Sequence, residues 1–106
     1  KRLILCSLLA IALLAIGCQT TPEKIRQKAD FGRLEFIDNF TSQHFPVRDV
    51  LVWLPEDYNP KERYAVLYMH DGQMLFDKST SWNKQSWNVD SVAQILQKDN
   101  RTRPFI

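Results

Sequence analysis

Residues 64–69 form a run of six apolar residues that leads directly into the tetrapeptide His70-Asp71-Gly72-Gln73. The run includes a β-branched valine and two tyrosines and has no charged residue. This composition is typical of a strand that is buried on both faces, as in a parallel sheet covered by helices. Such sheets bind ligands at the carboxyl ends of their strands. The run therefore predicts an α/β fold with a functional site at the tetrapeptide.

Gly72 suits this end of the strand to acyl-transfer chemistry. A glycine allows the backbone to turn sharply and to present N–H groups to an oxygen on which negative charge develops. The serine that such chemistry needs is not recognisable, because no serine of this chain stands in a Gly-x-Ser-x-Gly turn. The sequence therefore indicates one half of an active site and no nucleophile.

The amino-terminal residues 1–17 have the pattern of a secretory signal. Lys1 and Arg2 precede an apolar stretch over residues 3–16, which is shorter than the roughly 20 residues of a membrane-spanning helix. The end of this stretch, LAIGC, resembles the bacterial lipobox, in which the signal is cleaved before the cysteine and the cysteine is acylated. We therefore expect lipidation at Cys18. The alternative is an ordinary secreted protein in which the position of Cys18 is fortuitous.

Residues 18–31 are polar and have no apolar periodicity, so we expect a tether between a lipid anchor and a domain. Gln19 after the cysteine would fit the outer membrane of a Gram-negative cell envelope. Cys6 leaves with the signal, and the mature chain then has no pair of cysteines to oxidise. The 14 basic residues include Lys1 and Arg2, so the remaining ones balance the 12 acidic residues. This balance argues against a nucleic-acid partner.

The residues from 32 to 106 predict a series of strands and one helix. We expect strands at residues 34–38, 47–54 and 64–69, then a long loop, a helix from Asn88 to about Lys98, and a further strand beginning at 103–106. Pro55 ends the second strand. The side chain of Asn88 is expected to cap the helix, whose apolar stripe is Val89, Val92, Ala93 and Leu96. Three early strands, a first crossover helix and the start of a fourth strand match the opening of an α/β-hydrolase sheet, so we expect an incomplete, amino-terminal part of that domain.

Three segments of this region resemble the amino-terminal portion of the putative esterase family, which includes esterase D, enterochelin esterases, feruloyl and acetylxylan esterases, and mycolyltransferases. They are VWLPEDY at 52–58, YAVLYMHDGQMLFD at 64–77 and WNVD at 87–90. The resemblance extends over residues 32–106. It implies an α/β-hydrolase fold and a Ser-Asp/Glu-His triad, with a carboxylic ester as substrate and no cofactor.

The resemblance also assigns a role to one backbone group. It implies that the N–H of Gln73 is the first donor of the oxyanion hole. The second donor and the three triad residues are then expected after residue 106. We therefore expect the full-length protein to be a serine esterase that acts on a small-molecule or polysaccharide-linked ester, and residues 18–106 alone to be inactive. The alternative is a non-catalytic, lipid-anchored surface protein that keeps the hydrolase fold for binding.

Other residues near the tetrapeptide have two interpretations each. Asp71 either braces the turn by accepting backbone N–H bonds or contacts substrate together with Gly72. Trp82 and Trp87 either line a substrate cleft or belong to the core. His70 is expected to be structural, because neighbours on a strand point to opposite faces and it cannot share a substrate with Asp71. No metal is expected.

Overall fold

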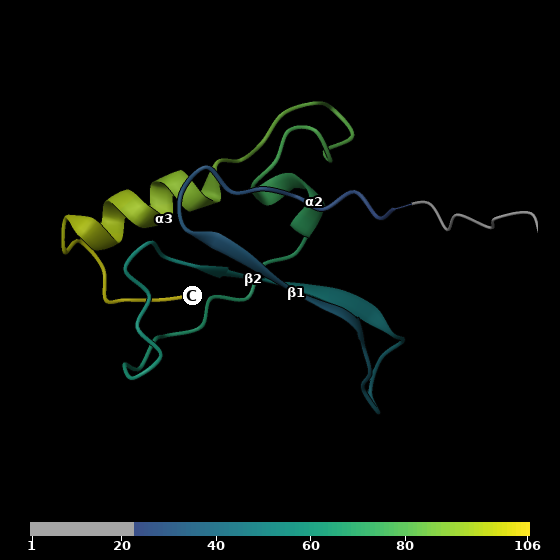
Figure 1. Cartoon of the computed structure of the whole chain (residues 1–106), viewed down its shortest axis with the longest axis horizontal. Helices are drawn as coiled ribbons and strands as arrows, with labels where there is room; N and C mark the ends of the chain where they lie inside the picture. Colours follow the sequence, from purple (N-terminus) through teal and green to yellow (C-terminus); the bar gives the residue numbers. More distant parts are fainter. Residues whose placement is uncertain (1–22) are drawn as a thin grey trace, which may run out of the picture.

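The computed structural model describes residues 23–106 (Figure 1). In chain order it has strand β1 (Arg33–Phe40), strand β2 (Arg48–Leu54), the short helix α2 (Gly72–Leu75) and helix α3 (Val89–Lys98). Helix α3 lies at one end of the strand pair, and the turn between β1 and β2 projects at the opposite end (Figure 1). The predicted signal peptide and its lipidation site Cys18 lie outside the described residues. Within the described part, neither helix has the length and hydrophobicity of a membrane span.

The first two predicted strands are confirmed, and they pair with each other as an antiparallel hairpin. The register runs from Arg33 opposite Leu54 to Ile37 opposite Val50. It shifts before the last pair, Phe40 with Arg48. The shift coincides with Asn39, which has a positive φ of 54°, a conformation that asparagine tolerates better than most residues. Strand β1 therefore continues through this irregularity beyond its predicted end.

The prediction of a third strand over residues 64–69, buried on both faces, is not confirmed. Ala65 forms only an isolated parallel bridge with Phe105, and the side chains from Val66 to Met69 are 43–90% exposed. A strand becomes buried on both faces when layers cover both faces and strands pair on both edges. Within residues 23–106, the run pairs on one edge only, with residues 104–106.

This short pairing involves the segment in which a fourth strand was predicted to begin, but that strand is likewise reduced to the isolated bridge at Phe105. The N–H of Ala65 donates to Pro104 (3.0 Å), that of Ile106 to Ala65 (2.9 Å) and that of Leu67 to Ile106 (2.8 Å). The two segments run in parallel, and α3 lies between them in the chain. Parallel neighbours need such a crossover connection. The described residues thus combine an antiparallel hairpin with a helical crossover, which is an α/β arrangement.

Helix α3 is confirmed, but two details of its prediction are wrong. Asn88 occupies the N-cap position with a φ of 50° and makes no side-chain cap hydrogen bond. Val92, which was expected on the buried stripe, is 54% exposed, whereas Ala93 is 3% exposed. The helix is turned so that polar side chains face the domain, because these side chains satisfy backbone groups of other segments.

Three side chains of α3 make these contacts, each with a different segment. The carboxylate of Asp90 accepts the N–H groups of residues 30 and 31 at 2.7 and 3.1 Å. The amide oxygen of Gln94 accepts the N–H of Glu56 at 3.0 Å. The amide of Gln97 both donates to and accepts from the backbone of Phe105, at 3.1 Å each. These hydrogen bonds give backbone groups of three other segments a partner on α3, so α3 fixes the positions of those segments.

The core lies between the hairpin, α2 and α3. Its buried members are Trp53, Leu75, Phe76 and Ala93, and partly buried apolar residues including Ala29 and Phe105 pack against them. Trp53 is the last residue but one of β2, while Leu75 and Phe76 come from α2 and its C-cap. The predicted site turn is therefore fastened to the core through its own apolar residues.

The segment before β1 also lies against the domain. Lys28 donates its backbone N–H to the carboxylate of Asp77 at 3.2 Å, and Ala29 packs on the core. These residues belong to the predicted tether over residues 18–31. The limits of that tether stay a prediction, but its described part makes specific contacts with the site loop rather than leaving the domain freely.

Candidate functional site

The predicted site is a tight turn that begins at Asp71 and continues into α2. Asp71 is the N-cap residue, with a left-handed backbone (φ 56°, ψ 44°), and its carbonyl oxygen accepts the N–H of Met74 at 2.8 Å. The expectation that Gly72 makes the sharp turn is therefore wrong, because the left-handed conformation falls on Asp71. Gly72 is the first helical residue. Apart from its chain neighbours and the backbone of α2, no atom lies within 4 Å of the position that a Cβ would take. The backbone of this turn is thus accessible from that side.

Hydrogen bonds from residues 80–88 hold the turn from its other side. The hydroxyl of Ser86 donates to the carbonyl of Phe76 at 2.8 Å and of Leu75 at 3.2 Å. It also accepts the N–H of Asn88 at 3.0 Å. The N–H of Trp87 donates to the carbonyl of Met74 at 2.9 Å. The last carbonyls of this short helix are therefore satisfied by a loop that follows it.

The carbonyl of Gln73 has a partner of its own. The hydroxyl of Thr80 donates to it at 3.3 Å and to the carbonyl of Asp77 at 3.0 Å. The carbonyl oxygens of residues 73 to 76 thus all accept hydrogen bonds from the loop that follows, which limits how far the turn can move.

The N–H of Gln73 is placed differently from these carbonyls. Gln73 is exposed, while the three residues after it, Met74, Leu75 and Phe76, are buried. N–H groups in the first turn of a helix have no partner within the helix, and that of Gln73 makes no hydrogen bond with another residue in the part of the chain that the structure describes. An exposed residue of a turn that is otherwise held therefore carries an N–H without a partner among residues 23–106.

Asp71 does not brace the turn with its carboxylate, because the side chain makes no cap hydrogen bond. The expectation of such a brace is corrected by the contacts above, since Thr80, Ser86 and Trp87 provide it instead. Asp71 and His70 are both exposed. Contact between Asp71 and a substrate stays a prediction, and it is compatible with the exposure of this residue.

The two tryptophans that were considered for a substrate cleft are at the surface of the loop after α2. Trp82 is 81% exposed and Trp87 is 53% exposed. Neither is a buried core residue, so the core interpretation is wrong for both side chains in the described structure. Their role in a cleft stays a prediction.

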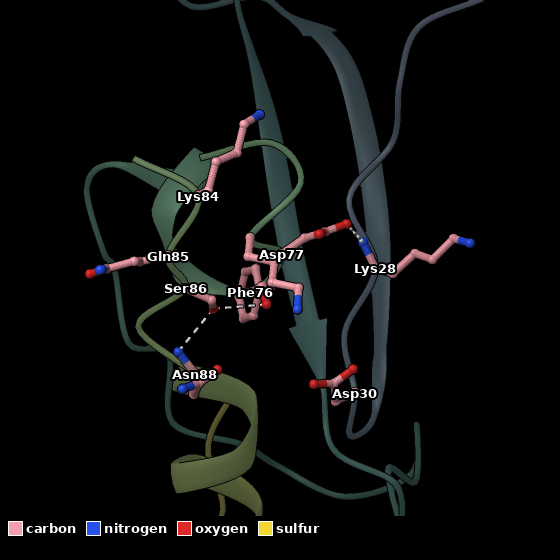
Figure 2. A pocket seen from close by; sticks show the side chains of 9 residues that line it. Lys28, Asp30, Phe76, Asp77, Lys84, Gln85, Ser86 and Asn88 are labelled. Atoms are coloured by element: carbon pink, nitrogen blue, oxygen red, sulfur yellow. Dashed lines mark hydrogen bonds between the residues drawn. The ribbon is translucent and has the colours of Figure 1, made fainter. Parts of the chain in front are cut away.

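A hollow of about 560 Å³ lies beside the turn, between the segment before β1 and residues 76–88. Figure 2 shows Lys28 and Asp30 on one side and Phe76, Asp77 and the loop residues on the other. Gln73, Trp82 and Trp87 do not line it. The hollow is thus separate from the free donor of Gln73.

The carboxylate of Asp77 bridges this hollow and belongs to the scaffold of the loop. It accepts the N–H of Ser79 at 2.8 Å and that of Lys28 at 3.2 Å. The bonds from Ser79 and then Lys28 favour the charged form and hold the pKa of Asp77 below its ordinary value. Among residues 23–106, no three His, Cys, Asp or Glu side chains gather as they would around a metal ion.

Sequence reasoning missed the residues that hold the site. Ser86, Thr80 and Asp90 have partners 7 to 60 positions away in the chain. Asp90 stands in the WNVD segment, whose resemblance to a family was the only signal available for it. No local sequence pattern tells whether a serine or threonine in an irregular loop donates to a distant carbonyl or is only solvated.

A comparison with protein families gives a match that includes the turn and the loop that holds it. The model of the family described as putative esterase matches residues 47–106, from the start of β2 through the turn, α3 and the final segment. The chain belongs to the putative esterase family. Comparison with the curated proteins and with the solved structures finds no match.

Membership in the putative esterase family gives the turn at residues 71–75 a chemical context, because the match includes the turn, its braces and α3. Residues before 47, which form β1 and the segment that lies on the site loop, are outside the match. The family supports an esterase or hydrolase function in general terms.

Proposed function

We propose that the full-length protein is a carboxylic ester hydrolase that forms an acyl-enzyme on a serine located after residue 106. The backbone N–H of Gln73 serves as one donor of its oxyanion hole. The observation that carries this proposal is that the N–H of Gln73 has no partner among residues 23–106, whereas the carbonyls of residues 73–76 in the same turn accept hydrogen bonds. Membership in an esterase family supports the reaction class.

The chemical reason is that a donor for a developing oxyanion must be fixed before the reaction. When a serine attacks an ester carbonyl, its oxygen gains negative charge, and a preorganised N–H stabilises that charge without reorganising in the transition state. One such donor is worth about 3 kcal/mol in comparable enzymes. The burial of Met74, Leu75 and Phe76 supplies the rigidity that this role requires.

The substrate class is a small-molecule or polysaccharide-linked ester, and no cofactor is needed for this chemistry. Asp71, Gly72, Trp82 and Trp87 are our candidates for contacts with it. The open space over Gly72 gives an ester carbonyl a route to the neighbouring N–H, and the exposed tryptophans offer apolar surface on the loop that follows.

An active-site label tests the reaction class. The full-length protein should hydrolyse an activated acyl ester and should be labelled stoichiometrically on one serine by a fluorophosphonate. We expect residues 18–106 alone to show neither activity nor labelling, because none of their serines stands in the Gly-x-Ser-x-Gly turn of a catalytic nucleophile. A full-length protein that is folded but unlabelled would instead support the non-catalytic binding protein.

We further propose that the protein is held in the bacterial cell envelope by acylation of Cys18, in the outer membrane if the cell is Gram-negative. The support is the lipobox-like sequence that ends at this residue. Metabolic labelling with a palmitate analogue should mark the wild-type protein and Cys6→Ser equally. Cys18→Ser should lose the label, and its persistence would contradict the proposal.

A further inference from the structure

The turn that joins β1 and β2 carries an unusual group of exposed side chains. Phe40 is 41% exposed, Phe45 40% and Val47 58%. The rings of Phe40 and Phe45 stack with their centroids 6.3 Å apart, and the guanidinium of Arg48 lies 4.7 Å from the ring centre of Phe45. We call these four residues the hairpin tip. It projects at the end of the hairpin away from α3 (Figure 1).

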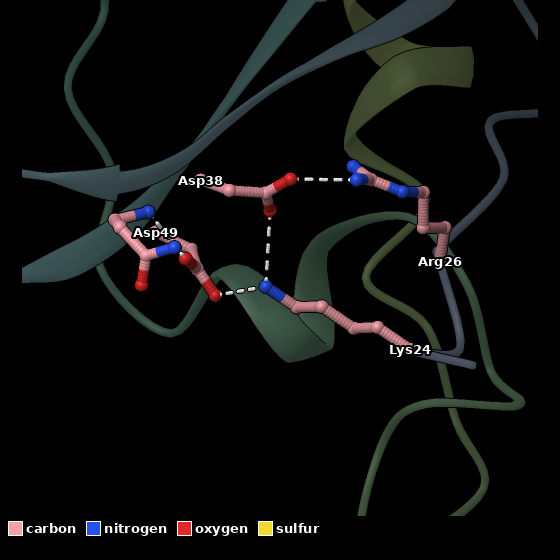
Figure 3. A network of polar contacts seen from close by, with 5 residues as sticks. Lys24, Arg26, Asp38 and Asp49 are labelled. Atoms are coloured by element: carbon pink, nitrogen blue, oxygen red, sulfur yellow. Dashed lines mark hydrogen bonds and ion pairs between the residues drawn. The ribbon is translucent and has the colours of Figure 1, made fainter. Parts of the chain in front are cut away.

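The charge of the hairpin tip suits an anionic surface. Residues 39–48 contain no aspartate or glutamate, and Arg48 supplies a positive charge. The nearest acidic residues along the strands are Asp38 and Asp49, and both are paired. Figure 3 shows Lys24 between the two carboxylates and Arg26 on Asp38, with distances of 3.1 Å from Lys24 and 2.6 Å from Arg26 to Asp38. An anionic surface approaching the tip therefore meets no unpaired carboxylate there.

The same ion pairs fix where the chain enters the domain. Lys24 is held beside Asp38 and Asp49, which flank the residues of the hairpin tip in β1 and β2. Cys18 precedes Lys24 by six positions, and six extended residues span at most about 20 Å. An acyl chain on Cys18 would therefore hold a bilayer within reach of the tip.

We propose that the hairpin tip docks into the surface of a membrane containing anionic phospholipid, beside the lipid anchor. The rings of Phe40 and Phe45 and the side chain of Val47 enter the interface between headgroups and acyl chains, where aromatic side chains are favoured. Arg48 pairs with lipid phosphates. This contact rests on the proposed envelope location and adds a second attachment, which sets the orientation of the domain on the membrane.

Vesicle binding by a protein without the acyl chain tests the contact separately from the anchor. The full-length Cys18→Ser protein should cosediment with vesicles of phosphatidylethanolamine and phosphatidylglycerol at about millimolar lipid. Added Phe40→Ser and Phe45→Ser should weaken this partitioning about tenfold, because the apolar anchors are lost. Added Arg48→Gln, which keeps the ring stack, should weaken it about fivefold at low salt. Trp82→Ser, which removes an aromatic residue that is more exposed than either phenylalanine and lies away from the tip, should leave the vesicle binding unchanged.

The outcomes separate this contact from the other proposals. Absence of vesicle binding by the Cys18→Ser protein, or binding that the tip substitutions do not reduce, would overturn the membrane contact. A change of oligomeric state in the Phe40→Ser, Phe45→Ser variant with unchanged vesicle binding would indicate a protein contact and would also overturn it. Fluorophosphonate labelling and palmitate labelling report on the reaction and the anchor independently, and thermal unfolding of each variant confirms that it folds.

Discussion

The indole Nε1 of Trp53 donates a hydrogen bond of 2.8 Å to the carbonyl oxygen of Phe31. This bond ties the end of β2 to the turn that starts β1. The N–H of Phe31 is held at the same time by the carboxylate of Asp90 at 3.1 Å. One peptide turn therefore connects both strands of the hairpin to the start of α3, and α3 follows directly on the loop that braces the candidate site.

Loss of the Asp90 carboxylate should destabilise the protein. Asp90 is 1% exposed and accepts two backbone N–H groups, so Asp90→Ala would remove the acceptor of two part-buried hydrogen bonds. We expect the free energy of unfolding to fall by about 2–3 kcal/mol, measured by urea unfolding of the full-length protein. Asp57→Ala, at an exposed position, is the control and should change it by less than about 0.5 kcal/mol. Equal effects of the two substitutions would contradict this role of Asp90.

The two glycines of the described chain should respond oppositely to alanine. Gly32 has a φ of 72°, and a Cβ there would lie 2.2 Å from the carbonyl oxygen of Leu54. Gly32→Ala should therefore lower the free energy of unfolding by more than about 2 kcal/mol. Gly72 has open space around it and lies in α2, so Gly72→Ala should be neutral or should stabilise by up to about 1 kcal/mol. Thermal unfolding of both variants, compared side by side, decides the point, and a harmless Gly32→Ala would refute the close approach.

Local sequence patterns predicted the elements whose structure depends mainly on residues close together in the chain. The strands over 34–38 and 47–54 and the helix after Asn88 could be located because alternation, Pro55 and helical spacing are read within a few residues. The strand over 64–69 could not be judged in this way. Its apolar composition reports a preference for burial, and burial also depends on which other segments cover it.

In the candidate site, too, local features could be predicted and contacts with distant segments could not. Sequence could point to the turn at Asp71-Gly72-Gln73, but it assigned the sharp backbone turn to Gly72 instead of Asp71, since glycine is the usual residue at positive φ. The braces from Thr80 and Ser86 depend on how a long loop returns to α2. No pattern in the chain encodes that return, so only the structure identifies them.

The ion pairs around Asp38 should make stability depend on pH in the acidic range. The hydrogen bond from Arg26, followed by that from Lys24, holds the pKa of Asp38 below the ordinary value of 3.8. A lowered pKa stabilises the folded state above 3.8, and this stabilisation is lost as the pH falls through the folded-state pKa. The urea midpoint of the wild type should therefore exceed that of Asp38→Asn at pH 6 and converge with it as the pH falls below 3.8. Because the groups are exposed, 1 M salt should also reduce the difference. A difference that persisted in strong acid would contradict this origin.

Ser86 should matter for activity through the position of α2. Ser86→Ala removes the donor to the carbonyls of Leu75 and Phe76, and we expect a loss of about 1–2 kcal/mol in the free energy of unfolding. A displaced turn should lower kcat about tenfold while KM changes little. Ser86→Thr keeps the hydroxyl and should restore most of kcat. Ser91→Ala, in α3, is the control for loss of a hydroxyl away from the turn. A kcat unaffected by Ser86→Ala would show that the brace is not needed for the reaction.

The most direct measurement of the central claim compares two substitutions at Gln73 in the full-length protein. Gln73→Ala keeps the backbone N–H, whereas Gln73→Pro removes it without breaking a hydrogen bond of the helix, because N–H groups in the first turn have no partner within the helix. With an activated acyl ester as substrate, we predict that kcat/KM stays within about threefold of wild type for Gln73→Ala and falls about a hundredfold to a thousandfold for Gln73→Pro. Equal activity of the two folded variants would contradict the assignment of this N–H to the oxyanion hole.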